Sequence, residues 1–370
     1  MMLTALPAYL RDTALRMLPH RTATGLFAVG TPTRDSPVLV TGNFTLTVRR
    51  LRAVLRGRDL WLLVADSKGI NVWCAAGGGH FTHHSIIAAV RVAGLANTVD
   101  HREIILPQLC ATGVERRRIT ETTGFSTRWG PARLEDLPAF LDRGARLHKA
   151  DRFMRFPLWE RLEMASMWGV PMLVVALPLL LILSGWPTAL AAGSAMAAMV
   201  FSLFALLPLL AIKGGRRYLT FAGLATAASL LGAALLAAGG LATAGHLTAV
   251  VVTCLAAIGL LSVDLAGTTP WYDSDVHTIL NPLEVELVSE RCSGAAECVQ
   301  VCPRDVLRMN GRGRKVEIVH PDQCMRCGAC IVQCPDDALR FRAGDGGVIE
   351  AATIRTTRMN MLGQRSIKVS

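Results

Sequence analysis

The N-terminal part of the chain alternates short apolar runs with amphipathic segments. Residues 60–65 form an uninterrupted apolar run of strand length, and residues 85–92 carry apolar side chains at helical spacing. Strands that alternate with helices are typical of an open, largely parallel sheet. We therefore expect an α/β domain over residues 1–158. The same reasoning predicts further elements at residues 25–30, 38–41, 51–56 and 103–107.

From residue 164 onward the alternation gives way to long stretches without ionisable side chains. They cover residues 164–183, 187–212, 219–238 and 247–263. A helix needs about twenty apolar residues to cross a bilayer. We expect a transmembrane domain of four helices within residues 159–266, with three spans as the alternative because the last stretch is short. The absence of ionisable residues from the stretches argues against an ion pathway through them.

Basic residues flank these stretches unevenly. Four precede the first stretch and three lie between the second and third, whereas residues 184–186 and 239–246 contain no lysine or arginine. Because cytoplasmic loops are rich in Lys and Arg, we expect a multi-pass protein of the cell (inner) membrane with both terminal domains in the cytoplasm. The basic residues are Lys149, Arg152, Arg155, Arg161, Lys213, Arg216 and Arg217.

Composition supports a membrane protein more than a nucleic-acid binder. Hydrophobic residues make up 51% of the chain, and its formal net charge is +11. Because the basic residues lie beside apolar stretches and no nucleic-acid recognition motif occurs, lipid headgroups are the expected partner and nucleic acid is not. Arg11, Asp12 and Arg16 interrupt the first residues, so we do not expect a signal peptide there.

Seven of the ten cysteines lie close together and form an internal repeat. Three cysteines of the first copy recur 32 positions later, and a proline follows the last cysteine of each copy. The complete second copy, C-x2-C-x2-C-x3-C-P, is typical of two-cluster bacterial ferredoxins, in which the fourth cysteine of each copy serves the other cluster. A zinc site needs neither the doubled motif nor the Cys-Pro endings. We predict a ferredoxin-like domain over residues 284–345, in a reducing compartment, with a [4Fe-4S] cluster held by Cys302, Cys324, Cys327 and Cys330.

The first copy of the repeat lacks one cysteine. Ala295 stands at the place that corresponds to Cys327 in the second copy. Three thiols with the remaining spacing resemble those of seven-iron ferredoxins, in which one site holds a [3Fe-4S] cluster. We favour such a cluster, and an incomplete site without a cluster is the alternative. Its ligands would be Cys292, Cys298 and Cys334.

Two further segments complete the predicted domain plan. Residues 267–283 are expected to be a linker between the membrane helices and the ferredoxin-like domain. Residues 346–370 are basic, poor in aromatic residues and expected to be a tail, for which the sequence indicates no function.

One cysteine of the α/β domain lies where a ligand is expected. The stretch Asn71-Val-Trp-Cys-Ala-Ala-Gly77 lies between a predicted strand and a predicted helix, so Cys74 falls in a strand-to-helix turn or a short helix. Gly77, Gly78 and Gly79 would leave the approach to the thiol free of side chains and admit a large flat cofactor. The alternative is a buried structural cysteine beside a core tryptophan.

The stretch from Asn71 to Gly77 resembles the cap-helix signature of the corrinoid protein family of microbial mercury methylation. This resemblance implies that Cys74 ligates the cobalt of a cobalamin-type corrinoid from its lower face. The sequence departs from the family at Gly78, where a lysine is usual that would lower the pKa of the thiol. Residues 30–46 also resemble the corrinoid-binding subunit of the carbonyl branch of acetyl-CoA synthesis, which belongs to the same superfamily. The residues implied to shape the corrinoid pocket are Asn71, Val72, Trp73, Ala75, Ala76 and Gly77.

The resemblance implies a corrinoid-dependent methyltransferase that transfers a methyl group from methyl-cobalt(III) corrinoid to Hg(II). A methylated folate, or its methyltransferase, would donate the methyl group. The ferredoxin-like domain resembles the small partner of the mercury-methylation protein and would act as a built-in reductase, supplied by an external low-potential reductant. That partner usually has additional cysteines near its C-terminus, and here no cysteine follows Cys334.

Two other functions stay open at this point. One is corrinoid methyl transfer to another acceptor, such as a metalloid or a cellular methyl carrier, which Gly78 and the missing C-terminal cysteines favour. The other is a membrane electron-transfer subunit without methyltransferase activity, whose N-terminal domain would serve only for docking. Cobalt content would separate this second function from the corrinoid functions.

Other potential ligands have weaker patterns. His80, His83 and His84 have helical i, i+3, i+4 spacing, but no carboxylate or cysteine completes the set, and a polar helix start explains them. Cys110 is expected to be a small buried thiol. The stretch Asp275-Val-His277 approaches the D-x-H-x-x-G motif that supplies a histidine to corrinoids, but it lacks the glycine, and we regard the similarity as chance.

Overall fold

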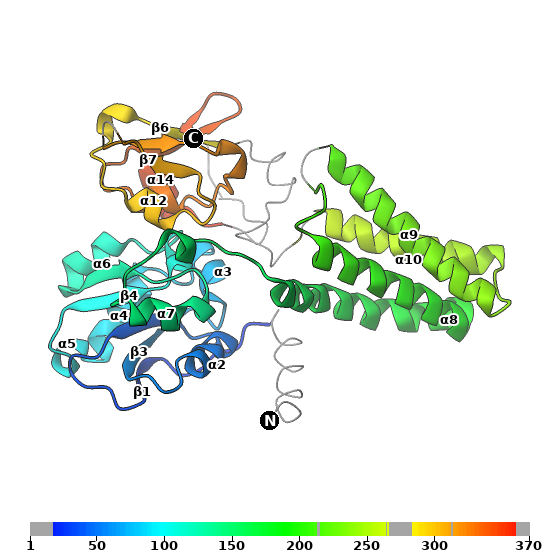
Figure 1. The fold of residues 1–370 in the computed structure, drawn as a ribbon, viewed down its shortest axis with the longest axis horizontal. Helices are drawn as coiled ribbons and strands as arrows, with labels where there is room; N and C mark the ends of the chain where they lie inside the picture. Colours follow the sequence, from blue (N-terminus) through cyan, green and yellow to red (C-terminus); the bar gives the residue numbers. More distant parts are fainter. Residues whose placement is uncertain (1–17, 213–214, 264, 266–282, 312–313, 360–370) are drawn as a thin grey trace. The chain divides into compact units, whose positions relative to one another are not determined.

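The computed structural model describes residues 18–212, 215–263, 265, 283–311 and 314–359 (Figure 1). These residues fall into two units. One joins residues 18–154 to the C-terminal region from residue 277 on, and the other holds the long apolar helices. The predicted linker up to residue 282, which includes Asp275 and His277, and the end of the predicted tail lie outside the described residues.

The N-terminal region folds around a five-stranded sheet in the order β1-β3-β2-β4-β5. β1 pairs with β3 in the antiparallel direction, and the other neighbouring strands are parallel. The predicted α/β fold with a largely parallel sheet is thus confirmed. The strands are β1 (Gly25–Val29), β2 (Val38–Gly42), β3 (Leu60–Ala65), β4 (Glu103–Leu106) and β5 (Ser126–Trp129).

Helices pack on both faces of this sheet, because successive strand residues point to opposite faces. Leu63 and Ala65 of β3 belong to one core together with α3, α4 and α6. Leu62 and Val64 belong to the other core together with α2 and α7. The elements between the strands are α2 (Thr45–Val54), α3 (Val72–Gly77), α4 (His83–Val92), α5 (Leu95–Thr98), η2 (Gln108–Cys110) and α6 (Arg116–Thr123), and those after β5 are η3 (Leu134–Asp136), α7 (Leu137–Asp142) and η4 (Lys149–Arg152).

The C-terminal region is a small α+β domain with its own core. Its three-stranded antiparallel sheet has the order β10-β9-β6, and β7 pairs with β8. Beyond residue 345, where a tail was predicted, β10 pairs with β9, and Ala351 and Ile354 of α14 are buried in the core, because these residues are apolar. The elements are β6 (Leu283–Leu287), η5 (Ser289–Arg291), α12 (Glu297–Val301), β7 (Leu307–Met309), β8 (Val316–Ile318), η6 (Pro321–Gln323), α13 (Ala329–Gln333), β9 (Leu339–Ala343), β10 (Val348–Ile349) and α14 (Ala351–Thr356).

The internal repeat of this domain extends to its backbone. Ala296 and Gly328, 32 positions apart, both have left-handed backbones, with φ of 61° and 73°, and each caps a five-residue helix. Asp305 and Asp337 form a second such pair, with φ of 54° and 50°. Non-glycine residues rarely adopt this conformation, so its recurrence shows that both copies form the same cysteine loop.

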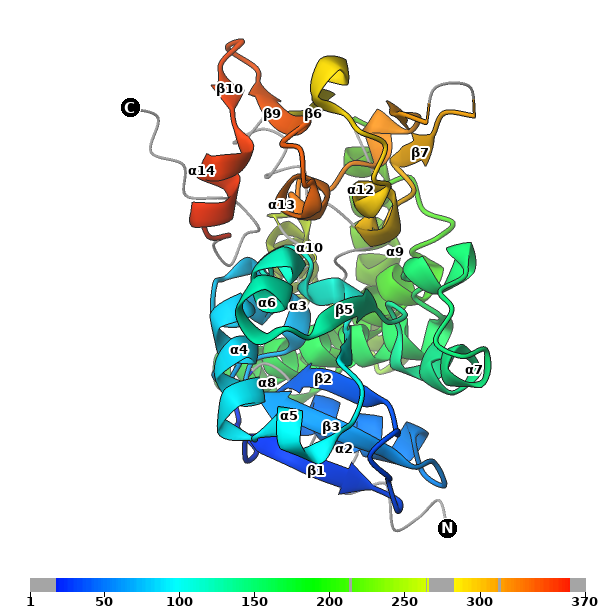
Figure 2. The same ribbon diagram turned by 90° about the vertical axis from the view of Figure 1, so that its left-hand side faces the viewer.

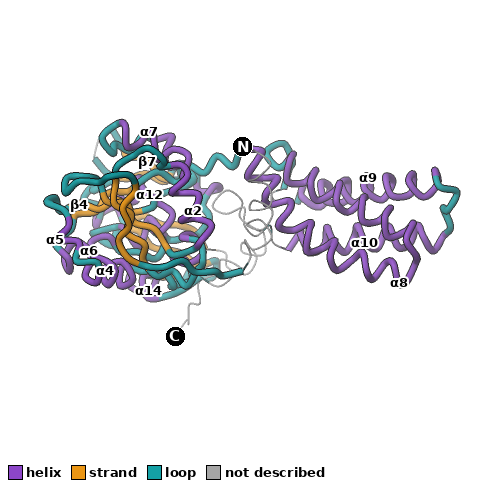
Figure 3. The backbone as a smooth tube through the Cα atoms, turned by 90° about the horizontal axis from the view of Figure 1, so that it is seen from below, coloured by secondary structure: helices purple, strands orange, loops and turns teal. Residues whose placement is uncertain are grey.

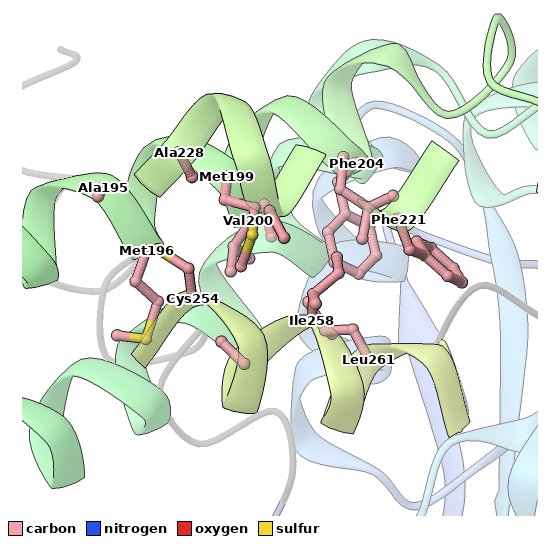
Figure 4. Packing of buried hydrophobic residues seen from close by; sticks show 14 of the residues in the cluster. Ala195, Met196, Met199, Val200, Phe204, Phe221, Ala228, Cys254, Ile258 and Leu261 are labelled. Carbon is pink, nitrogen blue, oxygen red and sulfur yellow. The ribbon is translucent and has the colours of Figure 1, made fainter. Parts of the chain in front are cut away.

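The apolar unit consists of α8 (Leu158–Leu206), α9 (Arg216–Ala238) and α10 (Ala244–Val263), three helices long and apolar enough to cross a membrane. Figure 3 shows them side by side, and Figure 4 shows their shared core, to which Met199, Phe204, Phe221 and Cys254 belong. The second predicted span, 187–212, ends earlier as a helix, at Leu206, because Pro208 lacks the N–H that a continued helix needs.

The first two predicted spans lie in the single element α8, which is interrupted at Gly185, where φ is 79° and ψ is 170°. A Cβ atom at Gly169 would lie 3.6 Å from Val200 Cγ1, and one at Gly193 would lie 2.6 Å from Leu177 Cδ2. Contacts of this order mean that the two halves of α8 run antiparallel and pack together. Where four separate helices were predicted, the structure therefore has three elements, one of which folds back on itself at a glycine.

Candidate functional site

The carboxyl edge of the sheet brings together the loops that carry the candidate ligands. The connection after β2 leads to β3 on one side, whereas the connection after β4 leads to β5 on the other. In open α/β sheets, ligands bind outside the carboxyl ends of the strands at such a change of direction. Residues 43–44 follow β2, residues 66–71 follow β3, and residues 107–114 follow β4.

Asn43 fixes the loop that leads to the candidate thiol. Its side chain is only 3% exposed, and its Oδ1 accepts hydrogen bonds from the backbone N–H groups of Ser67 (2.9 Å) and Gly69 (3.0 Å). Ser67 Oγ also donates to Asn43 Oδ1 at 3.1 Å and lies 2.8 Å from the carbonyl oxygen of Ile70. A buried oxygen with three donors holds the chain in one conformation up to Asn71.

Cys74 lies on α3, and Asn71 contacts it twice. The N–H of Cys74 donates to Asn71 Oδ1 at 2.9 Å, which caps the helix, and Asn71 Nδ2 donates to Cys74 Sγ at 3.3 Å. The residue is exposed, although protein atoms crowd the sulfur. This desolvation raises the pKa of the thiol above its ordinary value, and the hydrogen bond from Asn71 partly opposes the rise.

The other residues of the 71–77 stretch divide into two groups. Val72, Ala75 and Ala76 are buried in the core between the sheet and its helices, where they anchor α3. Trp73 is partly exposed, and Asn71 is exposed beside Cys74. Of the residues predicted to shape a pocket, the structure therefore brings Asn71, Trp73 and Cys74 to the surface.

The glycines after α3 accommodate a distant part of the chain, residues 357–359, which we call the C-terminal strap. The N–H of Met359 donates to the carbonyl oxygen of Gly77 at 2.7 Å. A Cβ atom at Gly79, where φ is +73°, would lie 2.7 Å from Arg358 Cδ. The side chains of Met359 and Arg358 thus occupy the space beside Gly77 and Gly79, while Cys74 itself is exposed.

Gly78 differs from its two neighbours. Its φ of −78° is a conformation that any residue adopts. A Cβ atom there would lie 3.1 Å from the carbonyl oxygen of Cys74 and 3.4 Å from His80 Cδ2. The backbone conformation at this position therefore admits the lysine that is usual in the resembled family.

Cys110 and the histidines differ from Cys74 in their surroundings. Cys110 is fully buried in the core, and this burial raises the pKa of its thiol strongly, as expected for a structural cysteine. His83 Nδ1 lies 3.7 Å from Glu115 Oε1, a carboxylate that the sequence spacing did not reveal, and burial lowers the pKa of His83. Among the described residues, no three His, Cys, Asp or Glu side chains gather as ligands of a single metal ion.

The four cysteines predicted to hold a [4Fe-4S] cluster line one pocket, which we call the four-cysteine site. The pocket encloses about 380 Å³ of space, part of it open to solvent, and its other walls include Val306, Leu307 and Phe341. Burial raises the pKa of Cys330 well above its ordinary value, and the nearby Cys327 raises it further. Four thiols around one apolar pocket fit an iron–sulfur cluster, whose irons would neutralise them as thiolates. The lining cysteines are Cys302, Cys324, Cys327 and Cys330.

The remaining three cysteines form the three-cysteine site. Burial, followed by the influence of Cys334, raises the pKa of Cys298 to about 12, and Cys292 contributes as well. Ala295 supplies no thiol here, so the described residues provide three ligands. The two sites share one detail: the N–H of Val306 donates to Cys302 Sγ at 3.4 Å and, 32 positions on, the N–H of Ala338 donates to Cys334 Sγ at 3.3 Å.

Comparisons with known proteins agree with a division into an α/β domain and a ferredoxin-like domain. Residues 14–141 match the family described as CO dehydrogenase/acetyl-CoA synthase delta subunit, and residues 291–338 match the 4Fe-4S dicluster domain. The resemblance to the acetyl-CoA synthesis family and the ferredoxin-like domain are therefore confirmed. The narrower resemblance to the mercury-methylation protein stays a prediction.

Curated relatives include several acetyl-CoA decarbonylase/synthase complex gamma subunits. The one from Methanopyrus kandleri is 32% identical over 34% of this chain and 27% of its own length. That from Methanosarcina acetivorans is 33% identical over 32% of this chain and 26% of its own length, and that from Methanocaldococcus jannaschii is 34% identical over 29% and 22%. The chain thus matches only about a quarter of the length of these relatives.

Proposed function

We propose, from the similarity of residues 14–141 to the acetyl-CoA synthase family, that this protein is a membrane-anchored corrinoid-dependent methyltransferase with its own iron–sulfur electron-transfer domain. The observation that carries this proposal is the surroundings of Cys74. It is an exposed thiol on the helix that follows β3, and its sulfur accepts a hydrogen bond from Asn71. The other cysteine of the α/β domain, Cys110, is buried and inaccessible to a cofactor.

Cys74 would hold the cobalt of a corrinoid, because a thiolate is a soft ligand that suits such a metal. Bound there, the corrinoid would supply a metal that accepts and releases methyl groups. Asn71 orients the sulfur through its amide, and Asn43 holds the loop before Asn71 in place. Asn71, Trp73 and Cys74 would face the corrinoid, while Val72, Ala75, Ala76 and Gly77 would shape the site by anchoring α3.

The C-terminal domain would supply electrons to this site. The four-cysteine site would hold a [4Fe-4S] cluster and the three-cysteine site a [3Fe-4S] cluster. Iron–sulfur clusters supply single electrons at low potential, and an external reductant would replenish them. The convergence of four thiols on one apolar pocket supports the first assignment, and the mutual influence of Cys292, Cys298 and Cys334 supports the second.

The apolar helices would anchor the protein in the cell membrane. With the two halves of α8 as separate crossings, α8, α9 and α10 would cross four times, which returns the chain to the side on which it entered. The basic residues before α8 and at the start of α9 support cytoplasmic positions for both terminal domains. Membrane lipid would then be the partner of the exposed apolar side chains, such as Ile182 and Leu183.

For the methyl acceptor we propose Hg(II), with a methylated folate or its methyltransferase as donor. This assignment depends on the resemblance of the 71–77 stretch to the mercury-methylation family. Gly78 and the absence of cysteines after Cys334 favour a second candidate, corrinoid methyl transfer to a metalloid or a cellular methyl carrier. A membrane electron-transfer subunit without methyltransferase activity would be the third function.

The test is to reconstitute the purified protein with cobalamin and compare Cys74→Ala with Cys254→Ala, which removes a buried thiol from α10. We expect the parent protein and Cys254→Ala to retain cobalt and to methylate Hg(II) when reduced and supplied with a methyl donor. Cys74→Ala should lose the spectral signature of thiolate-bound cobalt and methylate only at background rates. Iron-containing protein that retains no cobalamin would instead support the electron-transfer subunit, and cobalamin binding without methylmercury formation would support another acceptor.

A further inference from the structure

The ferredoxin-like domain contacts the carboxyl edge of the α/β sheet through α12 and α13. Figures 1 and 2 show these two helices beside α6 and the loops that follow β4. Val301 of α12, together with Cys327 and Ala329 of the second cysteine loop, belongs to the apolar core of the α/β domain. Five other cysteines of the ferredoxin-like domain pack within or against its own core, namely Cys292, Cys298, Cys302, Cys324 and Cys330. An apolar core shared by two domains resists separation, because separation would expose it to water.

Gln333 lies at the centre of the polar contacts. Its side chain is 6% exposed, and its Nε2 donates to the carbonyl oxygens of Ala111 (2.8 Å) and Val114 (2.7 Å). Its Oε1 accepts from the N–H of Arg116 at 3.4 Å. One side chain thus satisfies three backbone groups of the loop after β4.

Ion pairs surround this central contact. Arg116 Nη1 lies 2.6 Å from Glu297 Oε2. The guanidinium of Arg116 also donates hydrogen bonds to the hydroxyl and the carbonyl oxygen of Thr127. Lys149 Nζ lies 2.9 Å from Asp305 Oδ2. Arg355 of α14 lies 3.7 Å from Glu115. Charges of opposite sign on the two sides fix the register in which the domains meet.

We propose that the ferredoxin-like domain is docked in a fixed position on the carboxyl edge of the α/β sheet, with Cys327 of the four-cysteine site in the shared apolar core. The polar contacts lie beside the three-cysteine site, because Gln333 precedes Cys334 and Glu297 precedes Cys298. Gln333 is a positioning residue, because it acts through the loop of residues 111–116. Only the purpose of this docking rests on the proposed function: the docking would keep the electron donor next to the domain that receives the electrons.

Hydrogen–deuterium exchange of the full-length protein, with clusters assembled and no corrinoid added, tests the docking. Gln333→Leu should accelerate exchange of residues 108–118 by about tenfold, because three backbone groups lose their partner. The matched control is Gln323→Leu, which likewise precedes a cluster cysteine but whose side chain bonds to Arg304 and Asp322 of its own domain. It should leave residues 108–118 as in the parent protein. Unchanged exchange in Gln333→Leu, or equal acceleration in Gln323→Leu, would overturn the proposal.

A second variant tests the docking independently, in case Gln333→Leu does not fold. Glu297→Arg places two cations together in a partly exposed position, and it should accelerate exchange of residues 108–118 by about tenfold while iron content stays at the parent value. Exchange at the parent rate in this variant would contradict a fixed docking. Neither measurement requires corrinoid, so failure of the proposed methyltransferase function would leave their results intact.

The place of Cys327 in the shared core has its own test. Cys327→Ala, which disrupts the four-cysteine site, should accelerate exchange of residues 108–118 at least about fivefold. Exchange at the parent rate in Cys327→Ala would contradict a contribution of this site to the docking.

Discussion

Cys74 lies exposed on a six-residue helix with one side-chain donor at its sulfur, whereas the cysteines of the four-cysteine site line one apolar pocket. In both places the protein raises the pKa of a thiol, so the unmetallated side chain is protonated at neutral pH. The pocket gathers its own ligands. Cys74 depends on residues beyond its motif, chiefly Asn43 and the loop it holds. A cluster site can therefore be recognised in a sequence from its cysteine spacing alone. A site with one thiol can be recognised only together with the residues that hold its loop in place.

Removal of a ligand should have the largest effect at the four-cysteine site. Cys327→Ala leaves three thiols around a pocket built for four, so the site should lose about four irons per chain or retain a smaller cluster. Iron and sulfide analysis, with visible absorbance, measures this loss. Cys254→Ala should keep the iron content of the parent protein. Full iron content in Cys327→Ala would show that Cys327 is not a ligand.

A change of pH should affect the Cys74 site next most strongly. Surrounding protein raises the pKa of this thiol, so at pH 6 and at pH 8 the proton competes with cobalt for the sulfur. The apparent affinity of thiolate ligation should therefore fall about tenfold per unit as pH falls, or about a hundredfold from pH 8 to pH 6. A spectral titration with cobalamin measures it, and Cys74→Ala serves as the control without this dependence. A flat profile over this range would mean that the thiol titrates below it.

Loss of the contacts that hold the loop before Asn71 should destabilise the α/β domain without affecting the four-cysteine site. Asn43→Ala removes the acceptor of two backbone N–H groups and one hydroxyl, which should lower the free energy of unfolding of the α/β domain by about 2–4 kcal/mol. Chemical denaturation followed by tryptophan fluorescence measures the change. Iron content should not change. A destabilisation under about 0.5 kcal/mol would show that the loop does not need this oxygen.

The smallest expected effect is that of a single added charge. Gly78→Lys places an ammonium group near α3, where the backbone admits it, and should lower the pKa of Cys74 by about one unit. The rate of alkylation by iodoacetamide as a function of pH reports this pKa. Gly78→Gln is the matched neutral control and should leave it in place. Equal shifts in both variants would assign the change to packing and not to charge.

Much of the fold could be predicted because it follows from local pattern. The apolar run at residues 60–65 is β3, and residues 103–107 contain β4. β5 escaped prediction, because Ser126, Thr127 and Arg128 interrupt the apolar pattern of this short strand. α2 begins at Thr45, before the predicted residue 51, because its first apolar residues, Leu46 and Val48, alternate with threonines, a spacing more typical of a strand than of a helix. The fold of α8 at Gly185 falls between the first two predicted stretches, 164–183 and 187–212.

The candidate sites divide in the same way. Cysteine spacing identified the four-cysteine site, since the ligands of a cluster must recur at the spacing of its loop. The strap against Gly77 and Gly79 could not be predicted, because residues 358–359 are far from α3 in sequence and carry no ligand motif. Gln333 escaped notice for a similar reason: within its motif it is merely the residue before Cys334, and its partners lie in the other domain.

The strap has a practical consequence for anyone who purifies or shortens this protein. Because the N–H of Met359 donates to the carbonyl oxygen of Gly77, residues 357–359 lie beside the helix that carries Cys74. An affinity tag or an antibody epitope inserted directly after Met359 would lie close to that helix. Labels and attachment points should therefore be placed elsewhere, for instance in the connection between α9 and α10, so that the helix with Cys74 stays accessible.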